Sequence, residues 1–306
     1  MEALIKQLLV LYIFIIAGVI LGRWRKDMAG KSSLLSFLTV NLLLPCKMFL
    51  NFSRNFTVSY LQNNYITVFI SLGFLCLLLL LGGLTGKLLS REDGYGQKVY
   101  QYSVTVSNYA YFGYVLMENT FGPAALNNMM VFCLPFALYC YTFGVALLMD
   151  KKVSFKALCN PTTIAIAVGI VFGLTGLQLP EVVTTVASSA SGAMGPVTML
   201  LVGLVLSGFT LKELLPNWQA WAFSAIKLLV VPAIVFGLCK VLALVMTLPA
   251  SVYPVAVFTA AMPCGLNPVI YPKLVGKDCA IGAKLIPLTA ILSCATIPLW
   301  LYLTGM

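Results

Sequence analysis

Apolar runs, each long enough to cross a bilayer, follow one another along the chain with only short polar segments between them. Of the 306 residues, 60% are hydrophobic and 9% are charged, whereas about 25% of the residues in a soluble domain are charged. This small number of charges cannot cover a surface that faces water. Membrane lipid must therefore surround most of the chain. No segment is long or polar enough for a separate soluble domain. The sequence therefore predicts an all-α, multi-pass integral membrane protein.

The apolar runs predict ten transmembrane helices, at roughly 20 residues for each span. We expect the spans at Leu4–Gly22, Ser33–Phe52, Tyr65–Leu89, Lys98–Asn119, Ala124–Met149, Pro161–Leu177, Val182–Phe209, Trp218–Thr247, Ser251–Leu274 and Cys279–Tyr302.

The basic residues gather in every second loop, which is the bias of cytoplasmic loops in membrane proteins. The outer segments hold little beyond Lys6 and Arg54. The predicted inner loops hold Arg23, Arg25, Lys26 and Lys31, then Lys87, Arg91 and Lys98, then Lys151, Lys152 and Lys156, then Lys212, and finally Lys273, Lys277 and Lys284. This arrangement predicts a cell-membrane protein with both termini outside the cytoplasm. It also explains the net charge of +10 without a nucleic-acid partner.

The reactive side chains exclude most enzyme chemistry. The chain has no histidine, so imidazole catalysis and histidine-bound metals are excluded. Its nine cysteines are scattered singly along the apolar runs and form no metal or disulfide pattern. We expect neither an enzyme nor a cofactor, and coupling to H⁺ or Na⁺ stays open.

The two halves of the chain repeat each other. Gly18 of the first predicted span matches Gly169 of the sixth, 151 residues later. Pro45 of the second span matches Pro196 of the seventh at the same offset. Several matches in order with one offset indicate a duplication.

Each repeat contains five spans, with the first at residues 1–150 and the second at 157–306. Because five is odd, the second copy enters the membrane from the opposite side. Inverted repeats are typical of transporters, whose site lies at the midplane where broken helices from the two halves meet.

Spans four and nine are the expected broken helices. Asn108 and Pro263 both lie near the middle of their spans, and Pro263, Gly265 and Pro268 together disfavour a continuous helix. The alternative is a simple proline kink packed against its neighbours. If the helices are broken, their free backbone groups would attract a solute. The candidate substrate-binding residues here are Asn108, Tyr109, Tyr111, Pro263, Cys264, Gly265 and Asn267.

Three polar residues elsewhere in the spans are further candidates, since polar groups in lipid are often functional. Asn41 and Lys227 are added to the substrate-binding set, with interhelical hydrogen bonding and snorkelling as the respective alternatives. For Lys47, as for Lys227, the two interpretations are a functional site and snorkelling to an interface. No carboxylate is predicted at mid-membrane depth, because Glu118 and Asp150 lie near span ends. The composition therefore favours an anionic substrate.

The chain resembles the auxin efflux carrier family over nearly its whole length. The resemblance rests on motifs that are weak singly but occur in order: the Asn41–Pro45 segment, Asn160-Pro161, the stretch around Pro196, Lys227 with Pro232, Ala261-Met262-Pro263, and the closing Leu292–Leu299 run. The family includes plant PIN proteins and bacterial members described as malate or malonate permeases.

The resemblance implies a fold like that of the bile acid:sodium symporters and NhaA. Spans 1, 2, 6 and 7 would form a scaffold, and spans 3–5 and 8–10 a mobile transport domain with crossing breaks in spans four and nine. The implied function is elevator-type alternating access that carries a small organic anion, auxin in plants or a carboxylate in bacteria. A sodium-coupled symporter of the bile-acid type is one alternative, and a passive channel or membrane sensor is another. The oligomeric state stays open, with a homodimer as one expectation.

One departure concerns span four. Members of the family often carry a Gly-Asn pair, small residues and a Gly-x-Pro turn there, whereas this chain keeps Asn108, lacks the proline and adds Tyr109, Tyr111 and Tyr114. These side chains predict a bulkier pocket wall.

Overall fold

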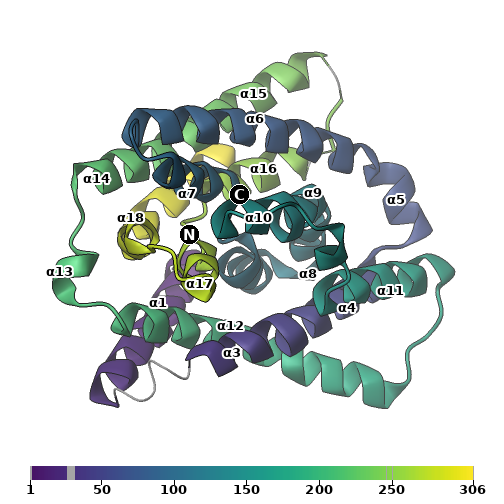
Figure 1. Ribbon diagram of the computed structural model, residues 1–306. Helices are drawn as coiled ribbons and strands as arrows, with labels where there is room; N and C mark the ends of the chain where they lie inside the picture. Colours follow the sequence, from purple (N-terminus) through teal and green to yellow (C-terminus); the bar gives the residue numbers. More distant parts are fainter. Residues whose placement is uncertain (1, 26–31, 246, 250, 306) are drawn as a thin grey trace. The chain divides into compact units, whose positions relative to one another are not determined.

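The computed structural model describes residues 2–25, 32–245, 247–249 and 251–305 (Figure 1). Two of the predicted inner-loop residues, Lys26 and Lys31, lie outside these ranges. The described chain is helical, and its β-structure is one isolated antiparallel bridge between Ser107 and Cys264.

Six described helices are long and apolar enough to cross a membrane, and a bent pair at 109–132 and 134–149 raises the number to seven. Two shorter apolar helices, Pro161–Thr175 and Val252–Ala261, coincide with parts of predicted spans. Large apolar side chains point outward on these helices: Leu80 is 68% exposed and Leu244 is 87% exposed. Such surfaces require lipid as the solvent. The chain is therefore an all-helical, multi-pass membrane protein, and the number of ten spans stays a prediction.

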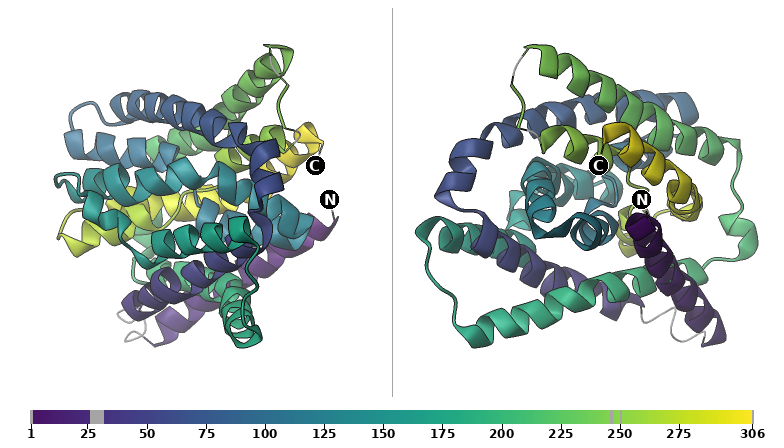
Figure 2. Two further views of the ribbon diagram at one scale, coloured as in Figure 1. Left: turned by 90° about the vertical axis from the view of Figure 1, so that its right-hand side faces the viewer. Right: turned by 180° about the vertical axis from the view of Figure 1, so that it is seen from behind.

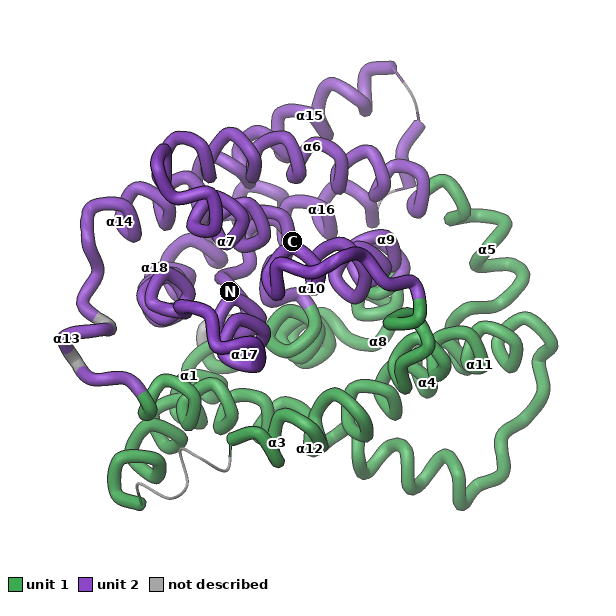
Figure 3. Tube along the Cα trace, viewed as in Figure 1, with its two compact units in different colours: residues 1–66, 110–130, 156–208 green, residues 67–109, 131–155, 209–306 purple. Residues whose placement is uncertain are grey.

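The described helices fall into two compact units (Figure 3). Unit 1 comprises residues 1–66, 110–130 and 156–208, and unit 2 comprises residues 67–109, 131–155 and 209–306. Each unit is assembled from separate stretches of chain, so neither coincides with one of the predicted repeats.

Unit 1 is built on two close helix pairs, α1 against α12 and α4 against α11 (Figure 2). Glycine permits both approaches: a Cβ at Gly203 would lie 2.1 Å from the carbonyl oxygen of Ile15, and one at Gly173 would lie 2.5 Å from that of Phe52. Small residues that let backbones meet are typical of membrane helix packing. The helices of unit 1 are α1 (Glu2–Trp24), α3 (Ser32–Leu38), α4 (Leu44–Asn55), α5 (Val58–Asn64), α11 (Pro161–Thr175) and α12 (Glu181–Ser207), with most of α8 (Tyr114–Phe132).

Within unit 2, the short helices α7 and α17 contact each other, and both contact α10 and α18. α18 contacts α7, α14, α16 and α17, and the indole N–H of Trp300 donates to the carbonyl oxygen of Leu228 over 2.8 Å. The helices are α6 (Ile66–Leu89), α7 (Gly94–Thr105), α9 (Leu134–Tyr139), α10 (Val145–Met149), α13 (Leu211–Leu214), α14 (Trp218–Ala225), α15 (Val231–Val245), α16 (Val252–Ala261), α17 (Asn267–Leu274) and α18 (Ala280–Thr304).

Several spans contain a π-helical turn, a feature that is often found at functional sites. These turns are η1 (Thr39–Leu43), η2 (Tyr109–Gly113), η3 (Cys140–Gly144) and η5 (Ile226–Val230). They contain Asn41, Tyr109, Tyr111 and Lys227, all of which are candidate residues. A short 3₁₀ turn, η4 (Phe155–Leu158), follows α10.

Candidate functional site: a crossing of two interrupted helices

The first interrupted helix is α7, which occupies the first part of predicted span four. Its start is capped by the carboxylate of Asp93, which accepts hydrogen bonds from the backbone N–H groups of Tyr95 and Gly96. Its end comes at Thr105, after which Val106 is extended, with φ −109° and ψ 99°. Helical turns resume at Tyr109. The chain is therefore unwound at residues 106–108, where the sequence predicts the break.

The second interrupted helix is α16, whose break is explained by proline. Pro263 disfavours a helical conformation at the preceding residue, and Met262 is extended, with φ −64° and ψ 144°. The chain becomes helical again at Asn267, with Pro268 in the first turn of α17, where a missing N–H costs nothing. A simple kink in a continuous helix is therefore excluded in this span.

The two unwound segments cross each other inside unit 2. Ser107 and Cys264 form the antiparallel bridge, and the backbone N–H of Asn108 donates to the carbonyl oxygen of Pro263 over 2.8 Å. The N–H of Cys264 donates to the hydroxyl of Thr289 in α18 over 3.1 Å. These hydrogen bonds pair backbone groups that lipid could not pair. They therefore stabilise the crossing from within unit 2.

The side chain of Asn108 stands beside Gly265 at this crossing. A Cβ at position 265 would lie 3.9 Å from Cγ of Asn108, which is ordinary contact. Asn108 is only 8% exposed, and its side-chain amide makes no hydrogen bond to any residue that the structure describes. The amide is not among the fully enclosed side-chain atoms that lack a partner in the described structure, so it keeps some access from outside. It is therefore available to a bound solute.

Lys227 lies at the other side of the unwound end of α7. Its ammonium group donates to the carbonyl oxygen of Val104 over 3.1 Å and to the hydroxyl of Ser107 over 2.6 Å, and the residue is completely buried. Snorkelling to an interface, the alternative interpretation of this lysine, is therefore wrong for the described structure.

A second polar cluster joins α7, η3 and α17. The amide of Asn267 donates to the hydroxyl of Tyr102 and lies 3.4 Å from Sγ of Cys140, and the hydroxyl and the thiol are 3.2 Å apart. Of these three residues only Asn267 was predicted. Tyr102 and Cys140 were missed because each resembles an ordinary residue on the apolar face of a helix. The only signal that pointed to them was the need for α7 to contact α17.

The remaining predicted residues divide between the units. Tyr109 follows Asn108 in unit 2, is buried, and packs edge-on against Phe136. Asn41 and Tyr111 belong to unit 1. The amide of Asn41 donates to the carbonyl oxygen of Phe37 over 2.9 Å, within its own helix. Neither interhelical bonding nor substrate contact is shown for Asn41 in the described part of unit 1.

Lys47 does not snorkel either. It is 4% exposed and forms an ion pair with Glu118, which is 35% exposed, within unit 1. The sequence placed the two residues in separate spans 71 positions apart and gave no reason to pair them. Two further amides on the same pair of helices, those of Asn51 and Asn127, are hydrogen-bonded over 2.9 Å. A buried polar seam therefore joins α4 to α8.

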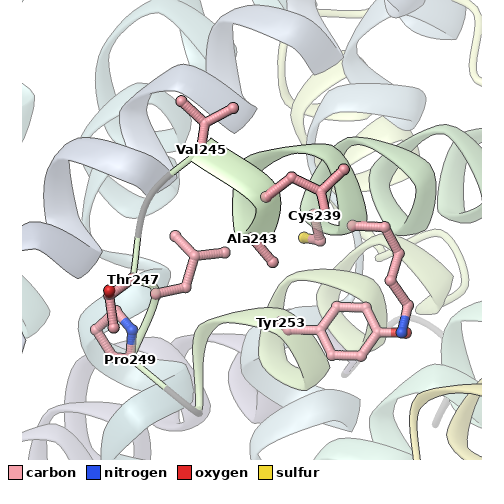
Figure 4. Close-up of a pocket in the computed structure, with 9 residues that line it drawn as sticks. Cys239, Ala243, Val245, Thr247, Pro249 and Tyr253 are labelled. Carbon is pink, nitrogen blue, oxygen red and sulfur yellow. The ribbon is translucent and has the colours of Figure 1, made fainter.

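A cavity of about 570 Å³ lies between the end of α15 and the start of α16 (Figure 4). Five of its nine lining residues are apolar, and its polar or charged members are Cys239, Lys240, Thr247 and Tyr253. The ammonium of Lys240 lies 4.9 Å from the centre of the Tyr253 ring. None of the candidate residues lines this cavity, so the crossing and the cavity are separate features of unit 2.

An all-helical, multi-pass membrane protein with unwound chain crossing inside it has the architecture that is typical of membrane transporters. Residues 144–301, just over half of the chain, match the family described as "Membrane transport protein". The chain belongs to this family, which is the auxin efflux carrier family that its sequence resembles, and this is a family of transport proteins and not of enzymes.

A relative from Methanothermobacter thermautotrophicus is named "Uncharacterized transporter". It is 24% identical to this chain over 203 residues, and the match covers 65% of either protein. The chain therefore spans slightly less than two thirds of that relative's length. The name of this relative agrees with the family and specifies no substrate.

Proposed function

We propose that this protein is a secondary transporter that carries a small organic anion, such as a carboxylate, across the cell membrane by elevator-type alternating access. The observation that carries the proposal is the unpaired amide of Asn108 at the crossing of the two interrupted helices. The ends of two half-helices beside an amide form the kind of site at which transporters hold their solutes.

Electrostatics favour an anion at this crossing. Lys227 places a buried ammonium at the end of α7. The N-terminus of α17, which begins at Asn267, is the end of a helix that carries partial positive charge. Among the described residues no carboxylate forms an ion pair with Lys227. A site with this balance of charge attracts anions and repels cations.

The division of the chain into units supports the elevator part of the proposal. Unit 1 contains predicted spans 1, 2, 6 and 7, which are the proposed scaffold, and unit 2 contains spans 3 and 8–10 with most of span 5. Residues 110–130, which include the second half of span four and the start of span five, group with unit 1. We retain ten spans, two inverted repeats at 1–150 and 157–306, and both termini outside the cytoplasm as parts of the proposal.

The proposed binding residues are those at or next to the crossing, joined by three that are less directly connected with it. Asn108, Tyr109, Cys264, Gly265 and Asn267 would line the site, with Pro263 shaping its backbone; Asn41, Tyr111 and Lys227 complete the set.

Flux in proteoliposomes tests the proposal directly. The full-length protein would be reconstituted and assayed with labelled mono- and dicarboxylates. We expect saturable flux that Asn108→Ala reduces about 10- to 100-fold, because a hydrogen bond to a charged group is worth about 1.5–3 kcal/mol. Asn63→Ala is the matched control, since Asn63 is an exposed residue that bonds within its own helix α5. Flux that does not saturate, or Asn108→Ala flux equal to that of the control, would overturn the proposal.

A further inference from the structure

The surroundings of the Lys227 ammonium are those of a bound cation. Its hydrogen-bond partners among the described residues are two oxygen atoms, the carbonyl oxygen of Val104 and the hydroxyl oxygen of Ser107. Both belong to the last turn of α7 and the unwound residues that follow it. The ammonium is wholly enclosed.

The C-terminal end of an interrupted helix is stabilised by a nearby positive charge. Its last carbonyl groups lack intrahelical partners and carry partial negative charge. In transporters with broken helices, such carbonyls and half-helix ends coordinate Na⁺ or H⁺. In this chain the position beside the end of α7 is filled by the chain's own side chain, on the π-helical turn η5.

A charge buried in this way needs compensation. The described structure has three ion pairs, and none of them involves Lys227. Its compensation comes from the helix end and from Ser107. The dependence is mutual, because the end of α7 would lose its counter-charge if the ammonium were removed.

We propose that Lys227 is a built-in monovalent cation, whose ammonium takes the place of a sodium ion at the broken end of α7. The crossing then requires no bound sodium ion to balance the charge at the end of α7. The inference rests on the proposed function, because it assigns the ion requirement of the same crossing. Beside its place in the proposed binding set, Lys227 thereby has a positioning role, which is to hold the unwound chain and its charge balance. The inference disfavours the sodium-coupled alternative.

The test is the melting temperature of the purified full-length protein in NaCl, KCl and choline chloride at equal ionic strength. Wild type should melt at the same temperature in all three salts. Lys227→Ala removes the ammonium and leaves room for an ion, so it should melt lower in choline chloride and recover by at least about 2 °C in NaCl. Lys227→Met fills the space without a charge and should melt lower in every salt.

Lys240→Ala is the matched control, because Lys240 is an exposed lysine of the same predicted span; it should acquire no response to Na⁺. A wild type stabilised by Na⁺, or a folded Lys227→Ala that responds to no monovalent cation, would overturn the inference. Where Lys227→Ala yields no folded protein in any salt, wild-type flux decides: flux unchanged when choline replaces Na⁺ supports the inference, and flux lost overturns it. Melting does not report anion flux, so failure of the proposed function is recognised separately.

Discussion

The backbone N–H of Cys264 donates to the hydroxyl of Thr289 over 3.1 Å, and both residues are buried. The bond anchors the unwound segment after α16 to a continuous helix, α18. The hydroxyl of Thr289 in turn donates to the carbonyl oxygen of Leu285 over 2.7 Å, so the anchor has a fixed orientation.

Thr289→Val should destabilise the protein, because it leaves the N–H of Cys264 buried without a partner. Such a loss costs about 1–3 kcal/mol of unfolding free energy. Thr289→Ser keeps the hydroxyl and removes only a methyl group, so it should cost about 0.8 kcal/mol. Denaturant titration in mixed micelles compares the two variants, and equal stability would contradict the anchoring role.

Gly203→Ala should separate α1 from α12. An added Cβ would lie 2.1 Å from the carbonyl oxygen of Ile15, and backbone cannot move aside cheaply. Overpacking of this kind costs about 1–3 kcal/mol. Gly192→Ala in the same helix is the control: nothing lies within 4 Å of its added Cβ, so it should stabilise the protein by about 0.5–1 kcal/mol. Both are measured by thermal melting, and a common sign for the two would contradict the packing described.

The ion pair between Lys47 and Glu118 should show energetic coupling. Glu118→Gln leaves the buried ammonium of Lys47 without its counter-charge, and we expect a loss of about 1.5–3 kcal/mol. Adding Lys47→Met removes the stranded charge, so the double variant should be more stable than the sum of the single effects by at least about 0.5 kcal/mol. A double-mutant cycle on unfolding free energy measures this difference. Additive effects would show that the pair contributes no coupling.

The pH dependence of stability should reveal the cluster around Asp150. Hydrogen bonds from Lys277 (2.7 Å) and from Lys98 lower the pKa of Asp150 from 3.8 to about 2. Because the folded pKa is depressed, the stabilisation is present above pH 3.8 and is lost as the pH falls towards about 2.

Asp150→Asn should remove this part of the acid sensitivity. Asp150 has a left-handed backbone, with φ 53°, and asparagine tolerates that conformation, so the substitution changes charge without adding strain. Melting temperatures of wild type and variant between pH 2 and 5 should converge at the acid end. A constant difference across that range would contradict the assignment.

The sequence predicted the helical runs well, because lipid imposes a strong length and composition rule on each span. The predicted run Tyr65–Leu89 is α6 at Ile66–Leu89, and Cys279–Tyr302 is α18 at Ala280–Thr304. Short helices within expected loops were missed, among them α5 and α13. Nothing in their composition separates them from other polar connections.

The candidate site was predictable where local chemistry determines it. Pro263 and Pro268 break a helix by their own covalent structure. Residues 106–108 contain no such signal, and there the bridge to Cys264 accounts for the unwound conformation. The partners of Lys227 lie 120 and 123 positions away, so only the folded chain could show which oxygens its ammonium meets.

The π-helical turn at Ile226–Val230 holds one more residue than an α-helical turn would, because its hydrogen bonds span five residues and not four. A version of this span shortened by one residue could wind regularly and gain ordinary bonding along its whole length. Because the π-helical turn absorbs the extra residue locally, that shortening would leave the helix beyond it in nearly the same phase. The surplus residue therefore acts locally, on the turn that carries the buried ammonium: a single-residue deletion there should displace Lys227 from the end of α7 while the helix face that carries Pro232 keeps its orientation.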